Sequence, residues 1–248
     1  MRAYNLSFIS NEDFYNHVKE TVEKYRFTIA LDSFNQNLID PIKLTFDSLI
    51  YKKNLEAVVE SEIIRQIDKS NTNHIGYFNQ NIFKYIGDGW SVPATGYDIV
   101  NVDKSIYVEI KNKHNTMNSS SSQKTFMRMQ STILKNPKAT CMLVEVIARE
   151  SQHKIWEVSL DSIHTSDPRI LRVSIDKFYE LVTGEKYAFK YVCEQIPKVI
   201  EDVLEDVVLD EKNNSVFEEL NKISPNLLKS IYLLSFEKYQ GFSNLNVE

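Results

Sequence analysis

The sequence predicts an α/β fold in which a central sheet is flanked by helices, with further helical segments at both ends of the chain. Residues 96–115 have the pattern of two strands joined by a short polar turn. Residues 140–148 are nearly all apolar, as in a strand buried on both faces. We expect a single domain with a helical part over about 1–54, a core over about 55–190 and a helical part over about 191–248.

Composition is that of one globular protein with a substantial core. Of the 248 residues, 42% are hydrophobic, and six Gly and six Pro argue against a disordered or fibrous chain. Cys141 and Cys193 form no CxxC pair, so neither a disulfide framework nor a structural zinc site is expected. No apolar leader and no stretch of about 18 apolar residues is present, so we expect a cytoplasmic protein without a membrane partner.

The first half of the chain reads mainly as helices. Ser10 followed by Asp13 resembles a helix cap and predicts a helix over about 11–25, and Pro41 begins a second one through Ile50. Residues 55–70 form an amphipathic helix. Its apolar stripe comprises Leu55, Val58, Val59, Ile63 and Ile67. The amide-rich segment that follows, through Ile86, is either a loop that reads base edges or a set of caps and turns.

Further helices and strands follow the two-strand pattern. A helix is expected from the serine run to about Asn136, with Phe126, Met129, Ile133 and Leu134 in its apolar stripe and Lys124, Arg128 and Lys135 facing outward. Residues 153–160 alternate as a strand, and residues 170–184 read as a short strand and a helix. Beyond about residue 190 the chain reads as helical, with Pro197 and Pro225 as its breaks.

Three charged residues around the predicted turn have the arrangement of a divalent-metal site. Glu109 and Lys111 project from one face of their strand, about 7 Å apart. A turn at residues 101–105 would fold Asp98 back beside them. Two carboxylates supply the hard oxygen ligands that Mg²⁺ prefers, and a nearby ammonium can handle the attacking water in phosphodiester hydrolysis.

The segment after this strand indicates contact with a polyanion. Residues 111–138 contain six basic and no acidic residues, although the chain has a formal charge of −5. Its polar side chains suit phosphate oxygens and base edges. The alternative is a flexible polar surface loop. The candidate DNA contacts are Lys113, His114, Asn115, Asn118, Ser119, Ser120, Gln123, Lys124 and Arg128.

Three further acids lie within or beside apolar segments. Glu62 lies beside the stripe of helix 55–70, where it either pairs with Arg65 or Lys69 or points at a metal; Glu60 is a weaker candidate. Glu145 is the one charge in the apolar strand over 140–148, and pairing at the strand end is favoured over catalysis.

The order of these elements resembles the PD-(D/E)xK nuclease superfamily. A helix with a glutamate precedes an aspartate, a hairpin and an ExK strand, and a basic crossover helix and a buried strand follow. More closely, VEIKNKHNTMNSSSSQKT and RQIDKSNTNHIGYFNQNIF resemble type II restriction endonucleases that cut short, interrupted GC-rich palindromes such as GGNCC. The resemblance spans about residues 35–195. Tyr97, in place of the motif's proline, precedes Asp98.

The resemblance implies a restriction-endonuclease-like core with a central mixed sheet. It implies that Asp98 and Glu109 hold Mg²⁺ with the Ile110 carbonyl, that Mn²⁺ can substitute, that Lys111 is the catalytic lysine and that Glu62 is an accessory acid. It also implies duplex DNA as substrate, a homodimer, a methyltransferase acting on the same site, and the bacterial cytoplasm.

Three other functions fit the residues less well. One is a DNA repair or junction-resolving nuclease of the same fold, and another is a DNA-binding module without activity. Paired carboxylates also serve glycoside hydrolysis, but only Trp90 and Trp156 could form a sugar platform, and a basic segment has no role there. The recognition sequence, the cleavage position and the overhang cannot be read from the residues.

Overall fold

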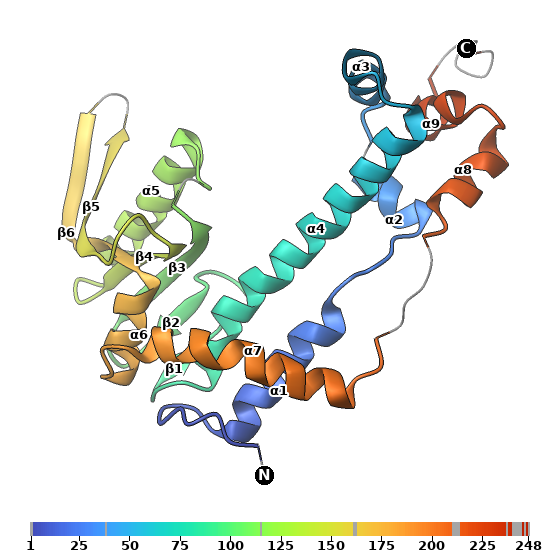
Figure 1. Cartoon of the computed structure of the whole chain (residues 1–248). Coiled ribbons are helices and arrows are strands. Elements are labelled where there is room, and N and C mark those ends of the chain that lie inside the picture. The colour runs from blue at the N-terminus through green and yellow to red at the C-terminus, as the bar shows by residue number, and fades with distance from the viewer. Residues whose placement is uncertain are drawn as a thin grey trace. The chain divides into compact units, whose positions relative to one another are not determined.

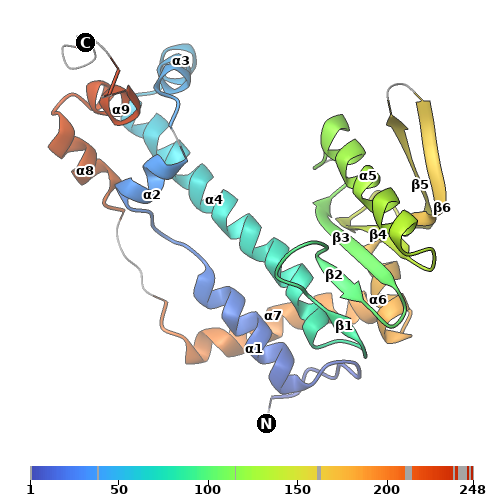
Figure 2. The same cartoon turned by 180° about the vertical axis from the view of Figure 1, so that it is seen from behind.

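The computed structural model describes residues 2–37, 39–114, 116–160, 163–209, 214–236, 238–239, 245 and 247. The chain forms two compact units, one of Met1–Glu23 with Ile75–Val208 and one of Lys24–His74 with Leu209–Glu248. The division falls inside helix α4 (Leu55–Asn81). Figures 1 and 2 show the elements of each unit from opposite sides. The single domain expected over the whole chain stays a prediction.

The first unit is built around a six-stranded mixed sheet, in the order β1-β2-β3-β4-β6-β5. The strands are β1 (Trp90–Ser91), β2 (Ile99–Asn101), β3 (Ile106–Lys113), β4 (Thr140–Ile147), β5 (His153–Leu160) and β6 (Ile163–Ser174). The three central strands β3, β4 and β6 pair in parallel, and the strands outside them pair antiparallel. This arrangement confirms the predicted α/β class with a central mixed sheet.

Helix α5 (Ser119–Lys135) connects β3 to β4 and covers one face of the sheet (Figure 1). The side chain of Asn118 accepts a hydrogen bond from Ser121 N at 2.8 Å and so caps the helix. Phe126, Met129 and Ile133 are buried against the sheet, as predicted. Leu134 is 83% exposed, so its predicted place in the apolar stripe is wrong. It lies 100° around the helix from Ile133, on the side turned away from the sheet.

Helix α6 (Ile175–Thr183) packs on the opposite face, and α1 (Asn11–Lys24) and α7 (Ala188–Asp206) contribute to the same core. The strands contribute Val108, Ile110, Met142, Val144 and Val173 to this core. Pro197 lies inside α7 and does not end it, contrary to prediction. A proline inside a helix costs about 3 kcal/mol. Buried valines on both sides of it, at about 1.5–3 kcal/mol each, offset that cost.

The second unit is helical and has a core of its own. It comprises α2 (Leu31–Gln36), α3 (Pro41–Tyr51), most of α4, α8 (Val216–Ile223) and α9 (Leu227–Phe236). The stripe of α4 predicted from Val58, Val59 and Ile63 is buried there. None of the helices in the described part of the chain is both long and apolar enough to cross a membrane.

The amide-rich segment after residue 70 is helical, so both expectations of a loop or of turns are wrong for it. Helix α4 continues to Asn81, and a 3-10 turn (Ile82–Lys84) follows. Ile82 and Phe83 are fully buried in the core of the first unit and hold this end of the helix. Gly76 is tolerated, and its Cα faces the amide of Asn112. Tertiary burial thus overrides the weak helix preference of the amides.

We expect Gly87→Ala to destabilise the chain more than Gly184→Ala. Both glycines have positive φ, 71° and 76°, so alanine costs about 1–2 kcal/mol at either position. A Cβ at Gly87 would also lie 2.8 Å from Val182 Cγ1 and 3.1 Å from its carbonyl oxygen, whereas a Cβ at Gly184 meets nothing within 4 Å. Thermal unfolding of both variants measures the difference. Equal melting temperatures would contradict this packing.

Candidate active site

Strand β3 places Glu109 and Lys111 on the face of the sheet that α5 covers. Val108 and Ile110, which alternate with them, are buried in the opposite core, so the predicted alternation is confirmed. Lys111 Nζ donates to Glu109 Oε1 at 2.7 Å. The two charged side chains therefore lie together, half-buried, near the end of the strand.

Asp98 lies directly before β2 and reaches the same place. The β2–β3 ladder ends at the pair Ile99 and Val108. Beyond it, Ile110 N donates to Asp98 Oδ2 at 2.7 Å, so a side chain continues the hydrogen bonding of the strand. Gln80 Nε2 holds the Asp98 carbonyl at 3.1 Å. The turn at 101–105 thus folds Asp98 back beside the strand that carries Glu109, as the sequence predicts.

The electrostatics around the carboxylates of Asp98 and Glu109 favour the binding of a cation. Burial raises the pKa of Asp98, and the neighbouring Glu109 carboxylate raises it further. The hydrogen bond from Ile110 and the charges of Lys111 and Arg128 oppose this rise without cancelling it. Ionised Asp98 therefore costs free energy that a cation beside it would recover.

Arg128 also belongs to the site, although the sequence predicts that it faces outward on its helix. Its guanidinium forms an ion pair with Glu109, donates to Gly96 O at 3.3 Å and lies 4.6 Å from the centre of the Tyr97 ring. The prediction that Arg128 faces outward on α5 is wrong, because the half-buried Glu109 carboxylate attracts it inward. Its Nε is buried without a partner among the described residues. The sequence feature that could have indicated this inward orientation is the position of Arg128 next to Met129, a member of the apolar stripe.

Glu62 belongs to the second unit and pairs within its own helix. Its carboxylate accepts from Arg65 Nε at 2.7 Å and from Gln66 Nε2 at 2.9 Å. Burial alone would raise the pKa of Glu62, but these hydrogen bonds outweigh burial and lower it. The pairing with Arg65 is confirmed, and the role of Glu62 as an accessory acid stays a prediction. Glu60 is exposed.

The candidate DNA contacts follow β3 directly and extend into the first turns of α5. Lys113, Ser119, Ser120 and Lys124 are exposed. Asn118 is engaged in the helix cap, and Gln123 Nε2 donates to Ser159 O of β5 at 2.7 Å. His114 joins a polar network with β4 and β6. Asn115 lies outside the described residues.

Comparison with known proteins identifies the family. The model of the Eco47II restriction endonuclease family matches residues 6–205. The chain belongs to this family. It is 34% identical to the type II restriction enzyme Sau96I of Staphylococcus aureus over 213 residues, which cover 81% of each chain. It is 28% identical to the type II restriction enzyme Eco47II of Escherichia coli over 216 residues, covering 81% of this chain and 89% of the relative.

Family membership confirms the resemblance found in the sequence. The chain is a type II site-specific deoxyribonuclease, a sequence-specific DNA endonuclease of a restriction–modification system. The match includes the whole sheet and helix α5. The idea of a DNA-binding module without activity is therefore set aside.

We expect Asp98→Asn to raise the melting temperature at neutral pH when divalent ions are chelated. The folded-state pKa of Asp98 is raised, so stability falls as the pH rises from the ordinary aspartate value through the folded value. Asparagine keeps an acceptor for Ile110 N and carries no charge. We expect a rise of roughly the 2–4 °C that accompanies 1 kcal/mol in a chain of this size, seen by calorimetry.

The pH dependence provides the control for this gain. Below about pH 3, well under the ordinary aspartate pKa, wild-type Asp98 is protonated in both states, and the two melting temperatures should coincide. Asp88→Asn, at an exposed position in the same unit, should leave the melting temperature unchanged. A gain that persists in acid would show a cause other than charge.

Proposed function

We propose that the chain cuts both strands of duplex DNA at a short GC-rich interrupted palindrome of the GGNCC type, with Mg²⁺ as its cofactor and Mn²⁺ able to substitute. The observation that carries the proposal is the hydrogen bond that brings Asp98 against the strand of Glu109 and Lys111. These three residues make up a PD-(D/E)xK site in this reading. The type of recognition sequence rests on the resemblance alone.

The donor set fits a divalent ion. Within the described residues no three His, Cys, Asp or Glu side chains gather as a metal site, so the third protein ligand would be a main-chain oxygen. Ile110 N points to Asp98, and in an extended strand the N–H and C=O of one residue point to the same side. Asp98, Glu109 and the Ile110 carbonyl would hold the ion. When bound, it would lower the pKa of a water ligand and neutralise charge on the phosphate.

The chain's own cations complete the site. The Lys111 ammonium, held by Glu109, would orient the attacking water and offset the charge of the scissile phosphate. Arg128 offsets the charge of the Glu109 carboxylate, with which it forms an ion pair.

The exposed polar groups that follow β3 would bind the duplex. We assign contacts with phosphates or base edges to Lys113, His114, Asn115, Asn118, Ser119, Ser120, Gln123, Lys124 and Arg128. A methyltransferase that modifies the same site would protect the host, whose cytoplasm is the proposed location.

Digestion of a sequenced plasmid tests the proposal. With Mg²⁺ or Mn²⁺ the wild type should give discrete fragments whose mapped ends share a GGNCC-like sequence, and chelation should stop cleavage. Lys111→Ala should lower the cleavage rate by roughly 100- to 1,000-fold and leave duplex affinity nearly unchanged, because it removes charge stabilisation and no base contact. Lys84→Ala, at an exposed position of the same unit, is the control. Normal cleavage by Lys111→Ala would remove that lysine from the mechanism.

We expect a two-fold homodimer on DNA. A palindrome presents the same sequence on both strands, so one subunit can serve each strand. Sedimentation velocity of the Lys111→Ala variant with a duplex that the wild type cuts should show two chains per duplex. A stoichiometry of one chain per duplex would exclude the dimer.

A further inference from the structure

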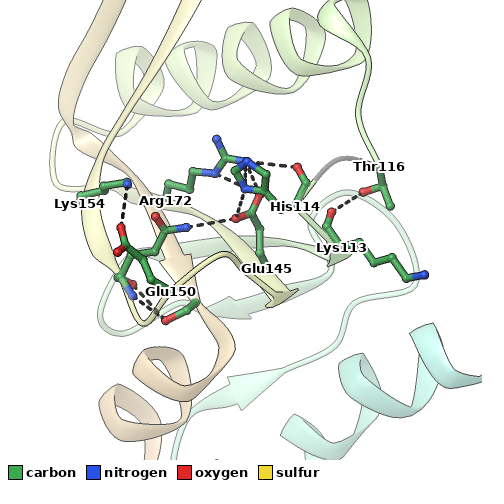
Figure 3. A network of polar contacts seen from close by, with 9 residues as sticks. Lys113, His114, Thr116, Glu145, Glu150, Lys154 and Arg172 are labelled. Atoms are coloured by element: carbon green, nitrogen blue, oxygen red, sulfur yellow. Dashed lines mark hydrogen bonds and ion pairs between the residues drawn. The ribbon is translucent and has the colours of Figure 1, made fainter.

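A buried polar network of strands β4 and β6 lies beside His114, where the segment proposed to contact DNA begins (Figure 3). Glu145 of β4 is 1% exposed, and the sequence-based expectation that it is paired is confirmed. It forms an ion pair with Arg172 of β6, whose Nε donates at 3.0 Å. Gln152 Nε2 donates to its other oxygen at 3.1 Å. The buried carboxylate is thus neutralised inside the protein, without help from the segment.

The same network holds His114, the residue after the end of β3. Arg172 Nη2 lies 2.8 Å from His114 Nδ1 and donates to His114 O at 3.3 Å. His114 N donates to Ile147 O at 3.0 Å. Both the main chain and the ring of His114 are therefore held where the segment leaves the sheet.

These contacts select one tautomer of the His114 ring. Nδ1 lies 2.8 Å from Arg172 Nη2 and 3.1 Å from Glu145 Oε2, and it cannot accept from one and donate to the other. Arginine is always a donor, so a proton on Nδ1 would set two N–H groups against each other at the shorter distance. Glu145 is already paired with the Arg172 guanidinium and does not need a proton from Nδ1. Nδ1 therefore accepts, and the proton lies on Nε2.

The other edge of the ring is available to a ligand. The side chain of His114 is 26% exposed, and its hydrogen bonds with described residues are made by Nδ1 and the main chain, not by Nε2. The exposed Lys113 lies next to it in the chain, and Thr116 Oγ1 closes a turn onto Lys113 O at 2.8 Å. In the Nε2–H tautomer this edge presents an N–H donor, and a basic residue directly precedes it in the chain.

We infer that Glu145 and Arg172 are positioning residues that hold His114 as the Nε2–H tautomer, and that this N–H donates to a hydrogen-bond acceptor of the bound duplex. The acceptor is a phosphate oxygen or the N7 or O6 of a purine. The inference rests on the proposed contact between this segment and DNA. It adds to that contact a donor whose orientation is set by two side chains of the sheet, Glu145 and Arg172.

Two substitutions of His114 separate the edges of its ring. His114→Asn keeps an acceptor near the Nδ1 position for Arg172 and loses the outer donor, whereas His114→Gln can carry an amide N–H to the Nε2 position. In the Lys111→Ala background we expect His114→Asn to bind a duplex that the wild type cuts roughly 10-fold more weakly, the loss of about one hydrogen bond. His114→Gln should bind within about threefold of the background. The reverse order would mean that His114 only supports the fold, and would overturn the inference.

A second duplex without a cleavage site distinguishes the two acceptors. If Nε2–H meets a phosphate, His114→Asn weakens binding to both duplexes equally. If it meets a purine edge, the loss is confined to the cleavable duplex. Either result supports the inference, and no loss on either duplex overturns it.

Nitrogen NMR of the histidine rings tests the tautomer without DNA. At pH 7.5 the wild type should show a bare Nδ1 and a protonated Nε2 for His114, identified by the signals that His114→Asn removes. The double variant Glu145→Gln/Arg172→Gln leaves no unpaired buried charge and should show both tautomers and the affinity of His114→Asn. A wild-type Nδ1–H tautomer or an imidazolium would overturn the positioning role. If the wild type cuts no duplex, the proposed function is wrong. The spectrum, which needs no DNA, would still test whether Arg172 and Glu145 fix the tautomer of His114.

Discussion

Where strand β2 ends, the carboxylate of Asp98 takes over the hydrogen bonding of strand β3. The bond from Ile110 N, at 2.7 Å, holds this carboxylate beside Glu109 although both are negative. Burial and repulsion raise the pKa of Asp98, so the pair is held together by the fold and not by mutual attraction. A site of this kind stores an unfavourable interaction that a divalent ion relieves on binding.

The sheet brings the candidate active site and the network around His114 to the same region of the protein. On the face covered by α5, Cys141, Leu143 and Ile170 pack under the helix, and the charged residues follow further along the same strands. Lys111 and Glu145 are register partners on adjacent parallel strands. The candidate active site and the network around His114 are thus neighbouring parts of one polar layer, at the carboxyl ends of the parallel strands where ligands of α/β sheets commonly bind.

Two of the acids in this layer, Glu109 and Glu145, each pair with an arginine. Glu145 is neutralised by Arg172, and Glu109 is shared by Arg128 and Lys111. Among the described residues, Asp98 receives a main-chain N–H and more distant positive charge, and burial together with Glu109 raises its pKa. The network around Glu145 is therefore complete within the protein and suited to positioning. The pair of Asp98 and Glu109 is incomplete and suited to holding an ion.

Local pattern alone determined much of this protein. The alternation of β3, the apolar run of β4 and the apolar stripe of α5 depend on neighbours a few residues away. They placed these elements and the group of Asp98, Glu109 and Lys111. Only the tertiary structure turned Arg128 inward, kept the amide-rich end of α4 helical and joined His114 to Arg172, 58 residues later. The reason is physical: a side chain's periodicity is set by its own segment, whereas its charge partner is set by the register of strands that are remote in sequence.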